Sequence, residues 1–350
     1  MMPSVTVAEM QRLARAMTYK YAIGGAPSGG AKCGIVADPT TPRKADILRG
    51  VASLIAPYVR PGIYRFGEDM GTTKDDIALM YRAAGADPIE LLKARAQRFG
   101  KELRLASDAT WATAGGKKFE DVITGHGLME VLLETCEVRG VDPRTLRVAI
   151  QGFGTVGAGL AELLDARGMS VIAVADAKGL LEQDGGLPVA ALLAARDALG
   201  TIDRARLPKG IRHRAREEWL DSPAEIVVPA AVADAITMNN VGAVKAQIVL
   251  EAANLPVTTE AEAALHARGI TAVPDFVANA GAAIGYAMLW HGPSPVERIV
   301  EDVGRHLRSV ARELLEASRA PGVLPRHAAE AVAVATLERH GVAHNRAGSP

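Results

Sequence analysis

The sequence predicts an α/β protein with two domains and C-terminal helices. Its 350 residues are enough for two domains, each with a core of its own. Residues 146–179 predict strand, glycine-rich turn, helix and second strand, and short apolar runs typical of buried parallel strands follow. We therefore expect an N-terminal α/β domain over 1–118, a Rossmann-type domain over 119–290 and helices over 291–350.

Composition and charge exclude several classes of protein. Lysine plus arginine and aspartate plus glutamate are 40 each, so no charge imbalance indicates a nucleic acid or an anionic surface as partner. The first residues lack a charged leader followed by an apolar run, and no apolar stretch is long enough to span a bilayer. Cys33 and Cys136 are too few for a disulfide framework and lack metal-ligand spacing. We expect a cytoplasmic enzyme for a small molecule, without a bound metal.

The N-terminal domain is predicted to alternate helices and short strands. Residues 5–19 place apolar side chains on one helical face, and the end of this helix delivers Lys20. The apolar runs Cys33–Val36 and Tyr64–Phe66 suit strands. The second run leads to Asp69, and catalytic residues commonly sit at such strand ends, because a rigid sheet holds them while loops admit substrate.

Two lysines, Lys20 and Lys32, are twelve residues apart across a glycine-rich turn. Gly29 and Gly30 precede Lys32, and small residues let the backbone bend and approach a bound molecule. If the two ammonium groups lie close together, each disfavours the charge of the other and burial lowers the pKa further, so one could act as a base. The alternative is a pair of exposed lysines beside a glycine turn, the commoner outcome for such a motif alone.

Asp69 has two interpretations. It could carry chemistry at the end of the predicted strand. It could instead cap the helix that begins near Thr73, because the segment DMGTTKDD is rich in capping residues. The residues by themselves favour neither.

The glycine fingerprint GFGTVG predicts a dinucleotide site, because it follows an apolar strand and opens an apolar helix. Gly152 permits the tight turn, Gly154 lets the backbone approach the pyrophosphate, and Gly157 lets helix and strand pack closely. Thr155 and Val156 then lie at the helix N-terminus that faces the phosphates. The alternative is a strand, turn and helix with glycines but no nucleotide.

Asp176 closes the second strand, about where an acid that binds the adenosine ribose is expected. A carboxylate there accepts hydrogen bonds from ribose hydroxyls and repels a 2′-phosphate, so the sequence favours NAD over NADP. Lys178 weakens this preference, because a nearby cation could tolerate the phosphate.

Several ordered motifs resemble the superfamily of glutamate, leucine, phenylalanine and valine dehydrogenases. MTYK ends at Lys20, GGAK ends at Lys32, and EDMGTT spans 68–73. The later motifs VPAAVADAIT, EAANLPVTTEAE and VPDFVANAGAA resemble glutamate dehydrogenase more than leucine dehydrogenase. The resemblance runs from residue 10 to about 320. It implies a homo-oligomer that performs reversible NAD(P)-linked oxidative deamination of an L-amino acid to the 2-oxo acid and ammonia.

The resemblance implies a role for each matching residue. Lys32 is the base that prepares water and stabilises negative charge, Lys20 holds the α-carboxylate, and Asp69 moves the proton of the substrate amine. The first domain would bind substrate and make subunit contacts, and the C-terminal helices would pack back on it. An isolated asparagine is more often a turn residue. After successive strand ends, however, the resemblance places residues that face the cofactor at Ala230 and Asn254, and one that faces the substrate at Asn279. The segment ITGHG resembles the family's ATGYG, whose threonine approaches the nicotinamide ring, so Thr124 is a further cofactor residue, although it could be an ordinary threonine at a helix start.

Two departures from the family pattern leave the substrate open between glutamate and a related or branched amino acid. The chain starts 19 residues before Lys20, so we expect a shortened first domain without the residue that recognises the substrate side chain. The start could be misassigned, the segment lost, or a partner could supply it. Tyr286 stands where glutamate enzymes have a small hydroxyl residue that helps bind the distal carboxylate, and an aromatic ring there would reshape the pocket.

Two other functions stay open from the sequence. One is an NAD-binding paralogue that acts as a sensor or partner subunit without turnover, because fold does not fix function. The other is a hydroxy-acid dehydrogenase. That chemistry usually uses a histidine–acid pair, and no histidine lies near the lysine motifs or EDMGTT.

Overall fold

The computed structural model describes residues 1–26, 28–98, 113–114, 117–197, 199–289 and 296–339. The chain divides into two compact units. The first contains Met1–Met17, Gly30–Ala109 and Met288–Pro293, and the second contains Thr18–Gly29, Thr110–Ala287 and Ser294–Pro350. Helix α1 (Val7–Ile23) therefore contributes to both. Most of residues 95–118, the end of the predicted first domain, lie outside the described residues.

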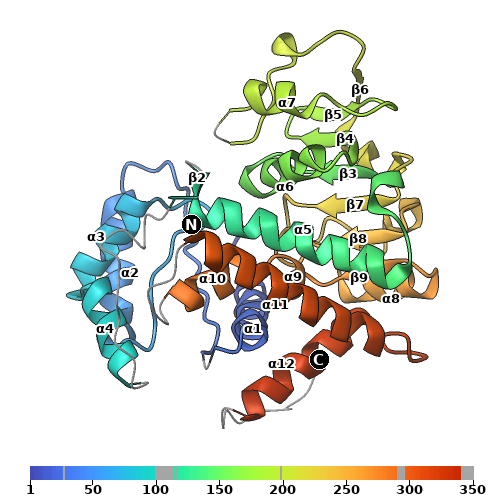
Figure 1. Ribbon diagram of the computed structural model, residues 1–350. Helices are drawn as coiled ribbons and strands as arrows, with labels where there is room; N and C mark the ends of the chain where they lie inside the picture. Colours follow the sequence, from blue (N-terminus) through green and yellow to red (C-terminus); the bar gives the residue numbers. More distant parts are fainter. Residues whose placement is uncertain (27, 99–112, 115–116, 198, 290–295, 340–350) are drawn as a thin grey trace. The chain divides into compact units, whose positions relative to one another are not determined.

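The first unit is built on a pair of helices. α2 (Lys44–Val59) packs against α3 (Lys74–Ala84) through buried apolar side chains that include Leu48 and Met80. Burying a large apolar side chain contributes about 1.5–3 kcal/mol, which makes this contact the core of the unit. α4 (Pro88–Arg98) follows in chain order and lies beside the pair (Figure 1).

The two short strands predicted in this unit are wrong. Neither Cys33–Val36 nor Tyr64–Phe66 is a strand, and the part of the first unit that the structure describes contains none. A strand needs a neighbouring backbone to pair with. Phe66 instead packs edge-on against Tyr81 of α3, with ring centroids 5.1 Å apart, and Tyr81 Oη donates to Phe66 O at 3.2 Å. Aromatic contacts with a helix hold this segment in place of strand pairing.

The second unit is organised around a seven-stranded sheet with the order β6-β5-β4-β3-β7-β8-β9 (Figure 1). β4, β3, β7, β8 and β9 pair in parallel, and β5 and β6 extend the β4 edge antiparallel. The strands are β3 (Arg147–Gln151), β4 (Ser170–Asp176), β5 (Gly179–Glu182), β6 (Arg212–Arg214), β7 (Ile226–Pro229), β8 (Ile248–Leu250) and β9 (Thr271–Val273). A separate two-stranded sheet pairs β1 (Thr113–Ala114) with β2 (Lys117–Lys118). The predicted α/β class with a Rossmann-type domain is confirmed.

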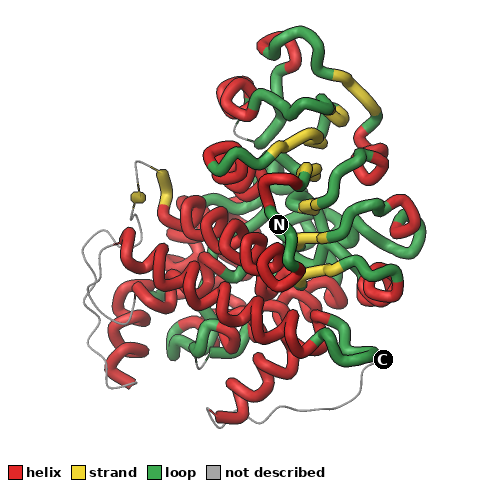
Figure 2. The backbone as a smooth tube through the Cα atoms, turned by 45° about the vertical axis from the view of Figure 1, so that its right-hand side comes forward, coloured by secondary structure: helices red, strands yellow, loops and turns green. Residues whose placement is uncertain are grey.

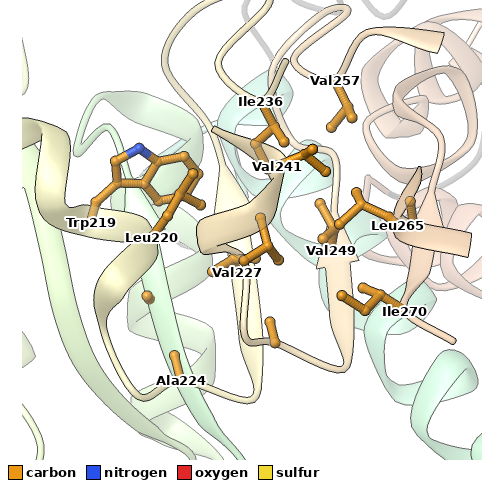
Figure 3. Close-up of a cluster of buried hydrophobic side chains, with 14 of the residues drawn as sticks. Trp219, Leu220, Ala224, Val227, Ile236, Val241, Val249, Val257, Leu265 and Ile270 are labelled. Carbon is orange, nitrogen blue, oxygen red and sulfur yellow. The ribbon is translucent and has the colours of Figure 1, made fainter. Parts of the chain in front are cut away.

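Both faces of the central strands are covered. Ile150 of β3 faces α6 (Thr155–Ala166), whereas its neighbour Ala149 belongs to an apolar cluster on the other face, since successive side chains of a strand point to opposite sides. Figure 3 shows this cluster, in which Trp219 and residues of β7, β8 and α8 (Thr259–Ala267) gather. Two covered faces explain why these strands are continuously apolar in sequence.

Two long helices, α5 (Phe119–Arg139) and α11 (Val296–Ala317), lie side by side in the second unit (Figure 2). Ile299, Val303 and Leu307 of α11 are buried, so this helix contributes to the core of the unit. No described helix combines the length and the apolar character that crossing a membrane requires. The other helices of this unit are α7 (Val189–Ala195), α9 (Asp275–Ala278), α10 (Gly281–Leu289) and α12 (Pro325–Arg339).

Candidate functional site

Two of the fingerprint glycines are required by the fold itself. Gly152 has φ +97°, and a Cβ built on it would lie 2.8 Å from Cβ of Ala231. A Cβ on Gly157 would lie 2.0 Å from Gly152 O, so α6 could not approach the turn with any larger residue. These two glycines set the start of α6 directly against the end of β3, as the sequence predicts.

Gly154 differs, because no described atom requires it to be glycine. Its φ is −70°, and a Cβ built on it would meet no atom within 4 Å. Gly154 is the N-cap of α6 and supplies no side-chain cap to the first turn, which begins with Thr155 and Val156. The unpaired N–H groups of such a helix start attract phosphate. The open space beside Gly154 therefore fits the predicted approach of a pyrophosphate.

The loops after β7 and β8 meet the fingerprint turn at the carboxyl edge of the sheet. Ala230 N donates to Gln151 O at 2.7 Å, which places Ala230 beside the turn. Ala253 N donates to Pro229 O at 2.8 Å and brings the loop of Asn254 to the same edge. The structure thus gathers these strand-end residues where open parallel sheets bind ligands.

Asn279, the C-cap of α9, adds a buried acceptor to this edge. Its side-chain Nδ2 donates to Ala252 O at 3.1 Å and to Ala253 O at 2.9 Å, and the residue is 8% exposed. The reverse amide orientation would set its oxygen against two carbonyls, so Oδ1 is the atom that points elsewhere. Oδ1 has no hydrogen-bond partner in the described structure. A buried acceptor of this kind is suited to an N–H donor from a ligand.

Lys20 lies in the last turn of α1 and reaches the same edge. The residue is 6% exposed, and Nζ donates to Asn254 Oδ1 at 2.7 Å. Two contacts within the second unit anchor this end of α1. The ring of Tyr19 packs on Phe276 with centroids 5.1 Å apart, and His306 Nε2 bonds the carbonyl of Ile23, the last residue of α1, at 2.7 Å. The sequence analysis placed Lys20 just after the helix, whereas it lies within it.

Thr124 lies inside α5 and packs close to α10. A Cβ built on Gly281 would lie 3.2 Å from Thr124 Cα, so the two helices cross closely just two residues after Asn279. Tyr286, further along α10, packs edge-on against Phe119 with centroids 5.7 Å apart. These contacts bring Thr124 to the segment of Asn279 and turn the ring of Tyr286 toward the start of α5.

Asp176 closes β4 as predicted, but its main partner was not predicted. Both carboxylate oxygens accept hydrogen bonds from the guanidinium of Arg204, with Nη2 to Oδ1 at 2.6 Å. Burial alone would raise the pKa of Asp176, but the bonds from Arg204 and from two backbone amides hold it below its usual range. Arg204 is 28 positions from Asp176, in a stretch for which the sequence analysis makes no prediction. A buried carboxylate is normally paired with a cation, so the position of Asp176 at the end of an apolar strand could have prompted a search for an arginine or lysine partner.

Lys32 and Asp69 form an ion pair within the first unit. Burial raises the pKa of the Asp69 carboxyl, but the Lys32 ammonium beside it outweighs this and holds the pKa below its usual range. The interpretation of Asp69 as the cap of α3 is wrong, because Thr73 is the cap and its hydroxyl accepts from Asp76 N at 3.3 Å. Lys20 belongs to the second unit, so the pKa coupling of the two lysines stays a prediction.

Comparison with known sequences decides the family. The model of the Glutamate/Leucine/Phenylalanine/Valine dehydrogenase family matches residues 115–344. The chain belongs to this family. The dimerisation domain of Glu/Leu/Phe/Val dehydrogenases matches residues 1–85, so both parts of the resemblance seen in the motifs are confirmed.

Three relatives illustrate the likeness. The catabolic NAD-specific glutamate dehydrogenase of Bacillus subtilis is 30% identical over 289 residues, and the glutamate dehydrogenase of Thermotoga maritima is 33% identical over 290. Both matches cover 80% of this chain but only 63% and 65% of those family members, so the chain spans less than two thirds of their length. The crystal structure of a hetero-hexameric glutamate dehydrogenase from Thermus thermophilus, in a Leu-bound form, has 27% identity and a TM-score of 0.76, and covers 97% of this chain and 79% of that one.

Proposed function

We propose that this chain is a cytoplasmic amino-acid dehydrogenase that reversibly deaminates an L-amino acid, glutamate or a related or branched one, to the 2-oxo acid and ammonia with NAD(P). The observation that carries the proposal is the convergence of Lys20, Asn254 and Asn279 at the carboxyl edge of the sheet. A buried cation suits a carboxylate, and a buried unsatisfied amide oxygen suits an N–H donor. An amino acid carries both groups on one carbon.

The residues at this edge fit NAD. The open side of Gly154 and the uncapped start of α6 at Thr155 and Val156 would hold the pyrophosphate. Ala230 and Thr124 would face the nicotinamide half. When bound, NAD takes a hydride from the α-carbon of the substrate. The NAD-specific glutamate dehydrogenase of Bacillus subtilis supports NAD as the cofactor.

The Lys32–Asp69 ion pair would supply the acid and base. Forming the 2-oxo acid requires water to add at the α-carbon. The Lys32 ammonium would first pass a proton to the Asp69 carboxylate. Nζ, then neutral, would accept the proton of that water, and the ammonium so formed would stabilise the developing negative charge. The Asp69 carboxylate, hydrogen-bonded to Nζ, would exchange protons with the substrate amine. Lys20 would hold the α-carboxylate in place while these transfers occur.

The proposal is tested by incubating the purified chain with a panel of L-amino acids, including glutamate and leucine, and either NAD or NADP. We expect reduced cofactor and ammonia in equal amounts with at least one amino acid. The reverse reaction should consume reduced cofactor when ammonia and the matching 2-oxo acid are supplied. Binding of NADH without turnover of any amino acid would contradict the proposal and support a sensor or partner subunit.

We also propose that copies of the chain assemble through the first unit. Residues 1–85 match the family's dimerisation domain. On α2, Leu54 is 78% exposed and Tyr58 is 58% exposed, and Ile63 shortly after the helix is 74% exposed. Neighbouring exposed apolar side chains of this size are typical of interaction sites. A second copy of this chain would cover them in a homo-oligomer.

A further inference from the structure

The acid expected to bind the adenosine ribose is already engaged. The side chain of Asp176 is 2% exposed, and Oδ1 accepts from Lys178 N at 2.8 Å and from Arg204 Nη2 at 2.6 Å. Oδ2 accepts from Ile202 N at 2.7 Å and from Arg204 Nη1. Each oxygen has two donors, which fills the acceptor capacity that ribose hydroxyls would otherwise use.

Arg204 is held in this position by further bonds. Nη1 also donates to Ile202 O at 2.8 Å, and Nη2 donates to Gly179 O at 3.2 Å. A guanidinium stays charged at physiological pH, so the pair of Asp176 and Arg204 carries no net charge. The carboxylate at the end of β4 is therefore neutralised by a paired arginine and does not act as an isolated negative charge.

The segment that carries Arg204 is packed on the fingerprint turn. Arg196 Nη1 donates to Gly154 O at 3.0 Å. Gly200, with φ +84°, lies so close to the turn that a Cβ built on it would be 2.5 Å from Gly154 N. Arg196 and Gly200 thus attach this segment to the turn, and Arg204 attaches it to Asp176, which fixes Arg204 in the adenosine part of the candidate cofactor site.

We propose that Arg204 makes this site accept NADP(H) as well as NAD(H), an inference that rests on the proposed function. An uncompensated carboxylate rejects a 2′-phosphate by repulsion, whereas a neutral ion pair does not. The four Nη hydrogens of Arg204 are already bonded, so the guanidinium would act on the phosphate through its positive charge. Lys178, exposed two residues after Asp176, adds a second cation at the same strand end.

The test is to titrate the full chain with NADH and NADPH separately, without amino acid, and to follow cofactor fluorescence. The wild-type Kd for NADPH should lie within about tenfold of that for NADH, because a compensated acid no longer rejects the phosphate. Arg204→Gln should raise the NADPH-to-NADH ratio of Kd values by at least about tenfold, because it leaves the Asp176 carboxylate without its compensating charge beside the phosphate. Arg204→Lys keeps the charge and should hold the ratio within about threefold of wild type.

Arg206→Gln is the matched control, because Arg206 is an exposed arginine at the other end of the same short 3₁₀ helix, Arg204–Arg206. The NADPH-to-NADH ratio of Kd values for Arg206→Gln should equal that of the wild type. Since each ratio is taken within one variant, partial loss of folded protein cancels. A wild type that binds NADH but not NADPH, or an Arg204→Gln variant with an unchanged ratio, would overturn the inference alone. A wild type that binds neither cofactor would end the proposed function as well.

Discussion

At the scale of single residues, Lys32 and Lys44 form a matched pair. Each lysine is bonded to an aspartate within the first unit, and their side chains are 23% and 22% exposed. Only Lys32 carries the proposed chemistry. Lys32→Ala should lower kcat by about 10²–10⁴-fold, the usual effect of removing a general base, and leave the Kd for NADH nearly unchanged. Steady-state turnover and an NADH titration measure both.

Lys44→Ala is the control for this prediction. It removes an ion pair of the same kind, Lys44 with Asp76 at 2.6 Å, and should leave kcat within about threefold of wild type because Lys44 has no part in the proposed chemistry. Equal losses of activity in both variants would show that the Lys32 pair is structural. Loss of NADH binding in Lys32→Ala would show that its role is misassigned.

Gly154→Ala separates a ligand requirement from a folding requirement. The added methyl group would meet no atom of the described residues within 4 Å, so the free energy of unfolding should fall by less than about 1 kcal/mol, the cost of alanine at an N-cap. The methyl group would fill the space proposed for the pyrophosphate, so the Kd for NADH should rise at least about tenfold. Urea denaturation and an NADH titration measure the two effects.

The contrasting variant is Gly157→Ala, whose Cβ would lie 2.0 Å from Gly152 O. It should destabilise the second unit by more than about 2 kcal/mol, in the range of overpacking a tight contact. If Gly154→Ala binds NADH as well as wild type does, the pyrophosphate does not pass beside Gly154.

Gly154 could be predicted as a site residue from the sequence, whereas Arg204 could not, and the reason is the distance along the chain over which each makes its contacts. A glycine in a strand-turn-helix pattern has a local backbone reason, so its position could be predicted from neighbours a few residues away. Arg204 meets Asp176 across 28 positions, and the bond exists because Arg196 and Gly200, earlier in the same segment, pack on the turn. No spacing rule links two such residues, since tertiary packing alone brings them together.

At the scale of elements, α3 tests the two interpretations of Asp69. Thr73 and Asp76 form a capping box, with Thr73 N donating to Asp76 Oδ2 at 2.8 Å. Thr73→Ala should lower the free energy of unfolding by about 1 kcal/mol, the usual cost of a lost N-cap. Asp69→Asn should change it by less than about 0.5 kcal/mol, because the Asp69 side chain is 47% exposed, yet lower turnover strongly. Urea denaturation measures both variants. If Asp69→Asn loses more free energy of unfolding than Thr73→Ala does, Asp69 has a structural role in this segment and the assignment of the cap to Thr73 is contradicted.

Strands could be predicted from the sequence where a continuous apolar run marks a strand that is buried on both faces. The parallel strands after β3 are buried on both faces, and their apolar runs at 225–231, 247–254 and 269–275 contain β7, β8 and β9. The antiparallel strands β5 and β6 were not predicted. β6 reads RHR, and its charged side chains are stabilised by acids on other elements, such as Arg212 with Glu182. Whether such a short edge segment forms a strand depends on its pairing with the neighbouring strand, so its own sequence does not predict it.

At the scale of the whole molecule, the proposed assembly rests on the exposed face of α2. Leu54→Glu combined with Tyr58→Glu should convert the oligomer into smaller species, because two charges would have to be buried in the interface. Sedimentation velocity measures the change. Leu199→Glu is the control, since Leu199 is 89% exposed but lies in the second unit. A monomeric wild type, or dissociation by Leu199→Glu alone, contradicts assembly through α2.

A buried cluster of charges ties the C-terminal helix to the sheet within the second unit. Nη2 of Arg326, in α12, lies close to three carboxylate oxygens. It is 3.1 Å from Oε2 of Glu251 after β8, 2.5 Å from Oε1 of Glu262 in α8 and 3.4 Å from Oδ1 of Asp275 in α9. Three carboxylates share one guanidinium, so the fully ionised cluster would have an excess of negative charge. Burial, together with repulsion from Glu262 and Asp275, raises the pKa of Glu251 well above its usual value.

This raised pKa predicts how stability depends on pH. Above the ordinary pKa of 4.5, the folded chain keeps a proton on Glu251 that the unfolded chain has lost. The free energy of unfolding should therefore fall as pH rises toward the folded-state pKa, by up to about 1.4 kcal/mol per pH unit for one proton. Glu251→Gln cannot titrate, so its unfolding midpoint should depend less on pH over this range.

Glu225→Gln is the control for this prediction. Glu225 pairs with Arg147, whose hydrogen bonds hold the pKa of Glu225 below its usual value. The contribution of that pair is complete above the ordinary pKa and is lost only as pH falls below it, so the variant should keep the wild-type slope at higher pH. Thermal unfolding over a series of buffers compares the three proteins. Parallel curves for wild type and Glu251→Gln would mean that Glu251 is ionised in the folded chain and that Arg326 alone balances the cluster.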